Sequence, residues 1–299
     1  MASRGIALSK GDKIFNVCNA ILMCLILVVT LYPFLNVLAI SLNDSTDTVR
    51  GGIYLWPREF TLKNYETIFG YSTLIQGFKV TISRTIIGTV LGLLSSAMLA
   101  YTISRPDFLS RKFVSKFLAI TMYVSGGLVP TFVLMRQLDL IGTFWVYIFP
   151  GIVSAFNVFV IRSFIDGLPY ALQESANLDG ANDFQIFYKV ILPLCKPVLA
   201  TITLFLAVGQ WNTWIDTYLY NANKPQWTTL QFELMKILQS TNQGGKMTNA
   251  NDLANQMAQV SPESIKMAIT IVVTVPILIV YPFLQRYFVD GMTLGAVKA

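Results

Sequence analysis

The sequence predicts an all-α polytopic membrane protein with six transmembrane helices. Only 13% of its 299 residues are charged, whereas soluble domains carry about 25%. The mean hydropathy is +0.57. Six windows of 19 to 30 residues contain no Asp, Glu, Lys or Arg, and a helix of about 20 apolar residues crosses a bilayer. Core helices of a large soluble protein are the alternative, but six windows of this length are rarely all core helices.

The six windows place the expected spans. The spans cover about residues 14–42, 78–104, 115–136, 142–164, 197–219 and 264–288. Around them we expect a basic tail over residues 1–13, one transmembrane domain over 14–290 and a second tail over 291–299. The chain is therefore treated as one membrane domain with two short ends.

Glycine and proline interrupt several of these spans. Gly88 and Gly92 stand in G-x-x-x-G spacing in the second span, which lets two helices approach closely; an incidental glycine pair is an equal alternative. Gly126, Gly127 and Pro130 interrupt the third span. A break at membrane depth is buried in protein or lines a wet cavity, so this span is either a pathway helix or simply kinked.

The basic residues predict the orientation of the chain. With the N-terminus in the cytoplasm, the inside segments hold 12 Lys and Arg residues and the outside segments hold 9. Arg105, Arg111, Lys112 and Lys116 cluster in one short inside loop. Since positive residues favour the cytoplasmic side, both termini are expected inside. The net charge is +6, but the basic residues flank the expected helices, so the charge does not indicate a nucleic-acid partner.

The composition disfavours several functional classes. The chain has no histidine, and its three cysteines have neither metal-ligand nor disulfide spacing, so no metal site is expected. It has no G-x-S-x-G motif and no G-x-x-x-x-G-K-[ST] loop, so it is not expected to be an enzyme or to hydrolyse ATP alone. Secondary transporters and channels usually carry charges inside their spans, whereas here Arg84 is the exception.

The most informative segment is the inside loop over residues 166–196. Pro169 suits the first position of a short helix that ends at Leu178, and Asp179-Gly180 is a turn pair. A second helix follows, with apolar residues at i, i+3, i+4 and i+7: Phe184, Phe187, Tyr188 and Ile191. Pro193 is expected to end that stripe. This helix–turn–helix could rest on the membrane interface, pack on its own bundle or dock into a groove on a partner.

A family resemblance decides between these alternatives. Residues 174–181 read Glu-Ser-Ala-Asn-Leu-Asp-Gly-Ala, followed by Phe187 and Leu192-Pro193. This run resembles the EAA loop of the permease subunits of binding-protein-dependent ABC importers. Ser175 stands where that pattern usually has Ala, and Ser is small enough to preserve docking.

Other stretches narrow the resemblance. They are residues 100–105, 126–130 and 291–298 and the pair Trp211-Asn212. These look like the carbohydrate-uptake permeases of bacteria, and most like the branch of the lipoprotein-associated and pectin- or alginate-oligosaccharide permeases. The likeness runs from about residue 10 to the end of the chain.

The resemblance implies a set of partners and a location. It implies a second homologous permease, two ATPase subunits that bind ATP and Mg, and an extracellular solute-binding protein. It implies that this chain binds no cofactor itself. It also implies a sugar or oligosaccharide substrate and a multi-pass position in the bacterial cytoplasmic membrane. An importer of this class for a non-sugar solute is the alternative.

The resemblance also implies roles for residues of the loop, which would be a coupling helix seated on an ATPase subunit. Glu174 and Asp179 would make polar contacts to the ATPase, and Gly180 would permit the turn. Ala176 and Ala181, with Ser175, would keep the surface low enough to dock. Phe187 would anchor the loop to the bundle. The tail over 291–298 would reach toward the ATPases, with a frayed terminus as an equal alternative.

Candidate substrate contacts lie in the fourth and fifth spans. Sugars are held by aromatic rings and by hydrogen bonds from amides and carboxylates. The candidates are Tyr147, Asn157, Gln210, Trp211, Asn212 and Asp216. Polar groups in a span usually face the bundle interior or a cavity. An interfacial aromatic belt is the alternative for the tryptophan, and interhelical hydrogen bonding is the alternative for the two asparagines.

Overall fold

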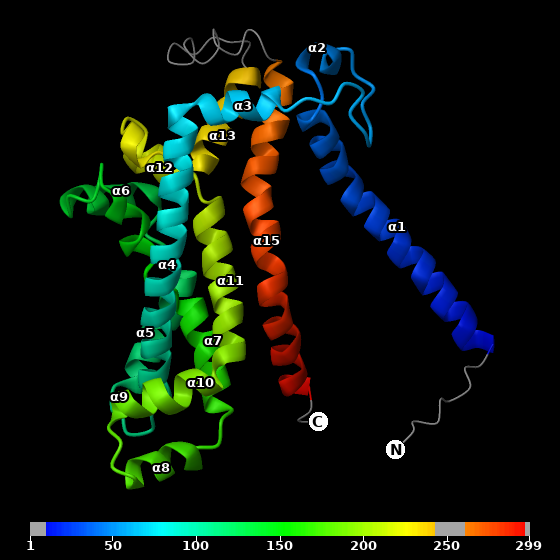
Figure 1. Cartoon of the computed structure of the whole chain (residues 1–299). Coiled ribbons are helices and arrows are strands. Elements are labelled where there is room, and N and C mark those ends of the chain that lie inside the picture. Colours follow the sequence, from blue (N-terminus) through cyan, green and yellow to red (C-terminus); the bar gives the residue numbers. More distant parts are fainter. Residues whose placement is uncertain (1–9, 243–260, 297–299) are drawn as a thin grey trace. The chain divides into compact units, whose positions relative to one another are not determined.

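The computed structural model describes residues 10–242 and 261–296, and it confirms the all-α prediction. Within that part of the chain, pairing of extended backbone is limited to one isolated bridge between Asn43 and Phe60. The chain divides into two units, Met1–Gly70 with Leu238–Val272 and Tyr71–Ile237 with Val273–Ala299. Figure 1 labels the helices of both units.

The first unit begins with the first predicted span. Helix α1 (Lys10–Ser41) runs through Pro33 without ending. The short helices α2 (Ser45–Thr48) and α3 (Lys63–Gly70) follow. The unit also holds the start of α15 (Pro262–Ala296).

Buried amide side chains hold the connection between α1 and α3 in place. Asn43 donates from Nδ2 to Oδ2 of Asp47 over 3.0 Å, and the same oxygen accepts from Nε of Arg58 over 2.9 Å. Asn64 donates to the carbonyl oxygens of Ser41 and Asn43, each over 2.9 Å. Because the connection lacks regular structure, these bonds satisfy polar groups that would otherwise be unpaired.

The second unit contains the remaining elements in a helical bundle. They are α4 (Ser72–Ser104), α5 (Arg111–Tyr123), α6 (Leu128–Gln137), η1 (Phe144–Tyr147), η2 (Phe149–Gly151), α7 (Ala155–Asp166), α8 (Ala171–Leu178), α9 (Asp183–Ile186), η3 (Phe187–Ile191), α10 (Leu192–Leu194), α11 (Lys196–Asn212), α12 (Ile215–Asn221), η4 (Pro225–Trp227), most of α13 (Leu230–Asn242) and the later part of α15.

The predicted spans differ in continuity. By length and composition α1 and α4 can each cross a membrane as one helix, and three bent pairs raise the number to as many as five among the described residues. The pairs bend by 119° between α5 and α6, by 48° between η1–η2 and α7, and by 83° between α9–α10 and α11. The third and fourth predicted spans are therefore broken, and the fifth is helical only to Asn212 before α12 begins.

The break in the third span confirms what its glycines predicted. Gly127 has a φ of +84°, a left-handed conformation that glycine adopts without a Cβ penalty. Pro130 lies in the first turn of α6, where its missing N–H costs no helical hydrogen bond. The chain therefore turns sharply here instead of kinking gently.

Helix α15 differs from the sixth predicted span and from the predicted tail. It contains Pro276 and Pro282 and continues through Gly291 to Ala296. The expected tail over 291–299 is thus largely a continuation of the helix, and residues 297–299 lie outside the described part. Residues 243–260 of the expected outside segment also lie outside it.

Helix α4 is the centre of the second unit and packs most extensively against α11 and α7 (Figure 1). A Cβ on Gly88 would lie 2.7 Å from Nε2 of Gln210, and one on Gly92 would lie 3.4 Å from a methyl group of Leu206. The two glycines therefore face α11, and the close-approach interpretation of their spacing is confirmed.

Small and branched residues fill the interior where α4, α5, α7, η3 and α11 meet. Ala100, Val158, Ile186 and Ile202 are all fully buried there. Within a lipid environment such packing stabilises through van der Waals contact and not through release of water. This buried cluster forms the support on which α8 and α9 rest.

We expect Gly88→Val to destabilise the protein by about 1–3 kcal/mol, because the added methyl groups overpack the contact between α4 and α11. The measurement is the thermal unfolding midpoint of the detergent-solubilised chain. Gly209→Val on α11 is the matched control, since nothing lies within 4 Å of the position that a Cβ would take there. Equal midpoints for the two variants would contradict the close approach.

Candidate functional site

The loop over residues 166–196 folds as the predicted helix–turn–helix. Gly180 has a φ of +81° and donates to the carbonyl of Asn177 over 3.0 Å, while Ala181 donates to the carbonyl of Ala176 over 3.0 Å. These two bonds form a Schellman motif at the end of α8. Ala176 and Ala181 also pack against the buried cluster, so the helical bundle covers the inner side of the turn.

A capping box starts helix α9, the second helix of the loop. The side chain of Asn182 accepts from the backbone N–H of Gln185 over 2.9 Å, and the Gln185 side chain accepts from the Asn182 N–H over 3.0 Å. The Asn-x-x-Gln spacing is the signal that could have predicted this start. Together with the Schellman motif, it pairs the backbone N–H groups of Gly180, Ala181 and Asn182 within the loop.

The predicted apolar stripe of the second helix is partly wrong. Phe187 and Ile191 are buried, but Phe184 and Tyr188 are 67% and 64% exposed. The buried face runs instead through Ile186, Phe187 and Ile191, so it is rotated from the predicted stripe toward Ile186. The helix also contains the π-helical turn η3, in which Leu192 donates to the carbonyl of Phe187, five residues back.

Pro193 was expected to end the apolar stripe, and the helical backbone runs through it by one residue. Helix α10 contains it near its first residue and runs to Leu194. The chain then bends by 83° before α11. A proline lacks the N–H that an α-helix would use and crowds the carbonyl four residues earlier, and the preceding π turn lies where that crowding would occur.

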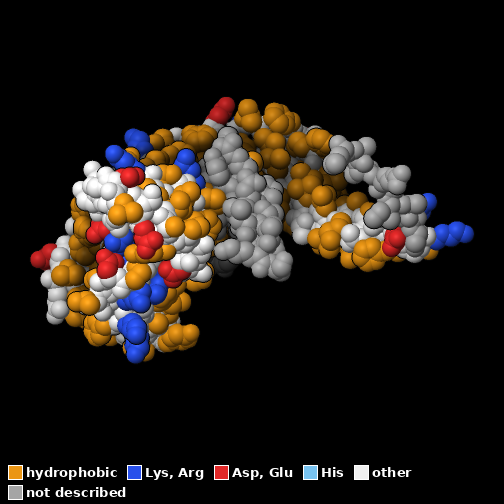
Figure 2. Space-filling model, turned by 90° about the horizontal axis from the view of Figure 1, so that it is seen from below, with side chains coloured by type: hydrophobic (Ala, Val, Ile, Leu, Met, Phe, Trp, Pro, Cys, Tyr) orange, Lys and Arg blue, Asp and Glu red, His pale blue; other side chains and the backbone are white. Residues whose placement is uncertain are grey.

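The loop presents one face outward and one inward. Glu174, Ser175 and Asp179 are exposed, and Leu178 between them is 88% exposed. Phe187 points inward, with its ring centroid 5.4 Å from that of Tyr101 on α4. Figure 2 views the molecule from this end and shows acidic and basic side chains interspersed with exposed hydrophobic ones. Leu178 was missed from the sequence, although an apolar residue directly before Asp-Gly is a visible signal.

A cavity of about 370 Å³ lies in the second unit between η1–η2, α11 and α12. It is lined by Arg84, Val146, Tyr147, Pro150, Gly151, Phe205, Leu206, Gly209, Gln210, Thr213, Ile215, Asp216, Leu219 and Tyr220. Three of the predicted substrate residues, Tyr147, Gln210 and Asp216, thus meet in one place. The break between α11 and α12 brings the last two of them to the cavity wall.

Arg84 of α4 organises the polar wall of this cavity. Its guanidinium donates from Nη2 to Asp216 Oδ2 over 2.5 Å, from Nη1 to Asp216 Oδ1 over 3.2 Å and from Nε to Gln210 Oε1 over 3.1 Å. It also donates to the carbonyl of Thr213 over 3.2 Å and lies 4.5 Å from the ring centroid of Tyr147. The sequence singled out Arg84 as an exceptional charge but assigned it no role.

The other predicted substrate residues lie outside the lining of this cavity. Trp211 donates from Nε1 to the carbonyl of Val273 on α15 over 3.0 Å. Asn157 is buried in α7, and Asn212 is exposed at the end of α11. Because successive helical residues are rotated by about 100°, Trp211 faces away from its neighbour Gln210.

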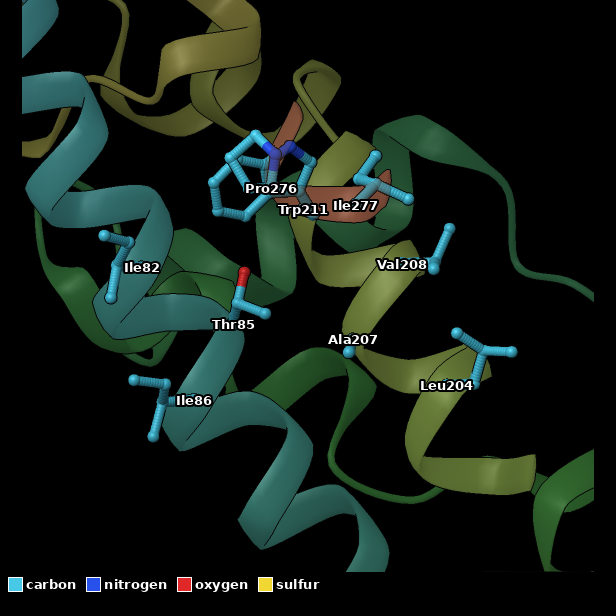
Figure 3. A pocket seen from close by; sticks show the side chains of 9 residues that line it. All are labelled: Ile82, Thr85, Ile86, Leu204, Ala207, Val208, Trp211, Pro276 and Ile277. Carbon is cyan, nitrogen blue, oxygen red and sulfur yellow. The ribbon is translucent and has the colours of Figure 1, made fainter. Parts of the chain in front are cut away.

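Trp211 instead lines a separate apolar pocket of about 150 Å³ between α4, α11 and α15 (Figure 3). Thr85 supplies the one hydroxyl among side chains that are otherwise apolar apart from the indole N–H. The remaining lining residues are Ile82, Ile86, Leu204, Ala207, Val208, Pro276 and Ile277. Such a lining suits hydrocarbon and offers a sugar few hydrogen bonds.

Comparison with known proteins gives consistent matches over nearly the whole chain. The family model described as the binding-protein-dependent transport system inner membrane component matches residues 8–294. Protein LplC of Bacillus subtilis (strain 168) is 33% identical, covering 97% of this chain and 97% of its own length. The polygalacturonan/rhamnogalacturonan transport system permease protein YtcP of the same organism is also 33% identical, covering 96% and 99%.

A solved structure agrees with these matches. It is a chain of a bacterial ABC transporter involved in the import of the acidic polysaccharide alginate. The likeness has a TM-score of 0.85 at 28% identity and covers 95% of this chain and 99% of that one.

We expect Arg84→Met to destabilise the protein by about 3–5 kcal/mol, because it leaves Asp216 without its buried partner. The double variant Arg84→Met with Asp216→Leu is expected to recover at least half of that loss, since no charge is then left unpaired. Denaturant unfolding of the purified chain measures both. Lys79→Met, an exposed position on the same helix, is the control; a double variant no more stable than the single one would contradict the pairing.

Proposed function

Because the chain belongs to the family of binding-protein-dependent transport system inner membrane components, whose members are permease subunits of ABC importers and not enzymes, we propose that it passes a sugar or oligosaccharide across the bacterial cytoplasmic membrane. The names of its relatives support the solute class. The name of LplC states no solute, but other relatives are named as a polygalacturonan/rhamnogalacturonan permease and an arabinooligosaccharide permease. The observation that carries the transport mechanism is the exposed turn at Gly180. An importer of a non-sugar solute is the alternative.

We propose six spans for the membrane domain, with both termini and the loop over 166–196 in the cytoplasm. The two long helices α1 and α4, the bent pairs containing α5, α7 and α11, and helix α15 supply six segments. The excess of Lys and Arg in the segments assigned to the inside supports the orientation. The loop then faces the compartment that holds ATP.

We propose that the loop couples the permease to a separate ATPase. Leu178 projects at the tip, flanked by the exposed carboxylates of Glu174 and Asp179. A short helix with an apolar tip and polar flanks suits a groove on a partner. Ser175 lies on the exposed side, Ala176 and Ala181 close the turn from within, and Phe187 holds the loop on α4. Two ATPase subunits would bind the ATP and Mg that this chain has no loop to hold.

We propose that a second, homologous permease covers the broken third span. Tyr123, Val124 and Leu128, which border the break, are 89%, 68% and 55% exposed in this chain alone. Non-helical backbone at membrane depth is tolerated only where protein or a wet cavity surrounds it. A partner subunit on this face would provide that cover and complete a pathway between the two chains.

We propose that Tyr147, Gln210 and Asp216 lie on the substrate pathway, to which an extracellular solute-binding protein delivers the sugar. Their cavity falls within the usual size of small-molecule sites. It combines aromatic surface with an amide and a carboxylate, which are the groups that bind sugars. Trp211 serves instead to hold α15 against α11.

Glu174→Ala and Gly180→Leu are expected to weaken co-purification of the ATPase or to uncouple its ATP turnover from transport. A side chain at Gly180 strains the left-handed turn by about 1–2 kcal/mol, and Glu174 loses a polar contact. The measurement is the yield of ATPase with the tagged permease, together with its ATP turnover. Gly70→Leu is the control, because its glycine has open space and no positive φ. If no ATPase accompanies the wild type and the variants behave alike, the loop is an interfacial helix and the coupling role is wrong.

Gln210→Ala is expected to raise the sugar concentration needed for half-maximal transport by about 3–10-fold, the effect of losing one hydrogen bond of about 0.5–1.5 kcal/mol. Uptake of labelled oligosaccharide into vesicles measures it. Asn212→Ala removes a similar amide two residues away from an exposed position outside the cavity, so it is expected to transport normally. Equal effects of both substitutions would remove the cavity from the pathway.

A further inference from the structure

Arg105 is an almost completely buried arginine at the end of α4. It is the residue directly after the helix and is 9% exposed. Its guanidinium contacts Asp107 through Nε and Nη2, each over 3.0 Å, and hydrogen bonds from it hold the pKa of Asp107 below its ordinary value. Asp107 lies in the connection between α4 and α5, so this pair does not reach the loop.

Two further contacts of Arg105 reach the loop, one to α8 and one to α9. Nη1 donates to Oε1 of Gln173 on α8 over 3.2 Å, and Nη2 lies 3.0 Å from Oδ1 of Asp183 on α9. Gln173 is itself buried and directly precedes Glu174. Gly180 lies between α8 and α9, so the side chain of Arg105, directly after α4, contacts the loop on both sides of the exposed turn.

Only an arginine can make this set of contacts. Its planar guanidinium offers five N–H donors in a fixed arrangement, and four contacts to three different side chains use that geometry. A lysine at the same place would offer one compact ammonium group that cannot hold separated acceptors in plane. The side chain also lies 5.9 Å from the ring centroid of Tyr101, the residue that stacks on Phe187.

Helix α4 continues without a break from this point to the membrane cavity. Arg84, which organises the cavity wall, lies about six helical turns earlier on the same helix. The helix packs against α7 and α11 along this length. One continuous helix therefore connects the contacts of Arg105 with the cavity wall at Arg84.

We propose that Arg105 is the positioning residue that transmits movement of the coupling loop to α4 and thereby to the cavity. The proposal rests on the proposed coupling function of the loop. Apolar packing of Phe187 and Ile191 holds the loop against the bundle, but packed surfaces can slide. The hydrogen bond to Gln173 and the ion pair with Asp183 join α8 and α9 to one residue at the end of α4.

The test uses the complex of both permeases, the ATPase and the solute-binding protein in lipid vesicles. It measures the number of sugars transported per ATP hydrolysed and the stimulation of ATP hydrolysis by the loaded binding protein. The key variant is Gln173→Leu with Asp183→Asn, which removes both bonds to the loop and leaves Arg105 paired with Asp107. We expect transport per ATP to fall about tenfold, a usual size for coupling between sites, with the ATPase still co-purifying.

Two single variants sharpen the result. Asp107→Asn removes a partner that does not reach the loop, and we expect its transport per ATP to stay near that of the wild type. Arg105→Lys keeps the charge but loses the planar arrangement of donors, and we expect it to fall between the wild type and the double variant. A merely structural role would lower the yield or thermal stability of the complex and leave transport per ATP unchanged.

The outcomes distinguish the role of Arg105 from the proposed coupling function of the loop. If the double variant assembles and transports as many sugars per ATP as the wild type, Arg105 does not transmit movement, while the coupling function stands. The same conclusion follows if Asp107→Asn uncouples as strongly as the double variant. If the wild-type complex contains no ATPase, both proposals fall together.

Discussion

A peptide group inside a bilayer finds no water to bond with, so each interruption of a membrane helix has to be satisfied by the protein itself. In this chain, side chains from other helices supply many of those bonds. Arg84 donates to the carbonyl of Thr213 between α11 and α12, and Asn221 donates to the carbonyl of Thr143 before η1. Trp211 donates to the carbonyl of Val273, three residues before Pro276. The polar residues of the spans thus have structural duties that come before any contact with a solute.

Helix α4 combines these duties in one element. Its two arginines, Arg84 and Arg105, are both nearly buried and both neutralised by carboxylates. A buried ion pair contributes little net stability, because desolvation offsets much of the attraction, but it defines which atoms meet. One arginine defines the cavity wall and the other defines the seat of the loop. The helix between them is continuous, whereas the predicted spans that contain α5, α7 and α11 are bent or broken.

The loop shows how an exposed element can be rigid without being buried. The Schellman motif at Gly180 and the capping box at Asn182 satisfy the ends of both helices locally, so the turn does not depend on a partner for its shape. Phe187 and Ile191 then pack into the core. A preformed surface of this kind loses little conformational entropy when it docks, which suits the coupling role proposed for the loop.

Features that depend on local chemistry could be predicted from the residues alone. Charge-free windows located α1 and α4, Gly126 and Gly127 located the break before α6, and Asp179-Gly180 located the turn, because glycine conformation and apolar length act over a few residues. The direction in which the side chains face depends on packing between helices. Gln210 and Trp211 are neighbours in sequence, yet one lies beside Arg84 and the other beside α15. Phe184 and Tyr188 matched an α-helical stripe, but the face that packs on the bundle contains Ile186 and Phe187. The partners of Gln210 and Trp211 are 126 and 62 positions away in the sequence, and a periodic pattern within one segment does not identify them.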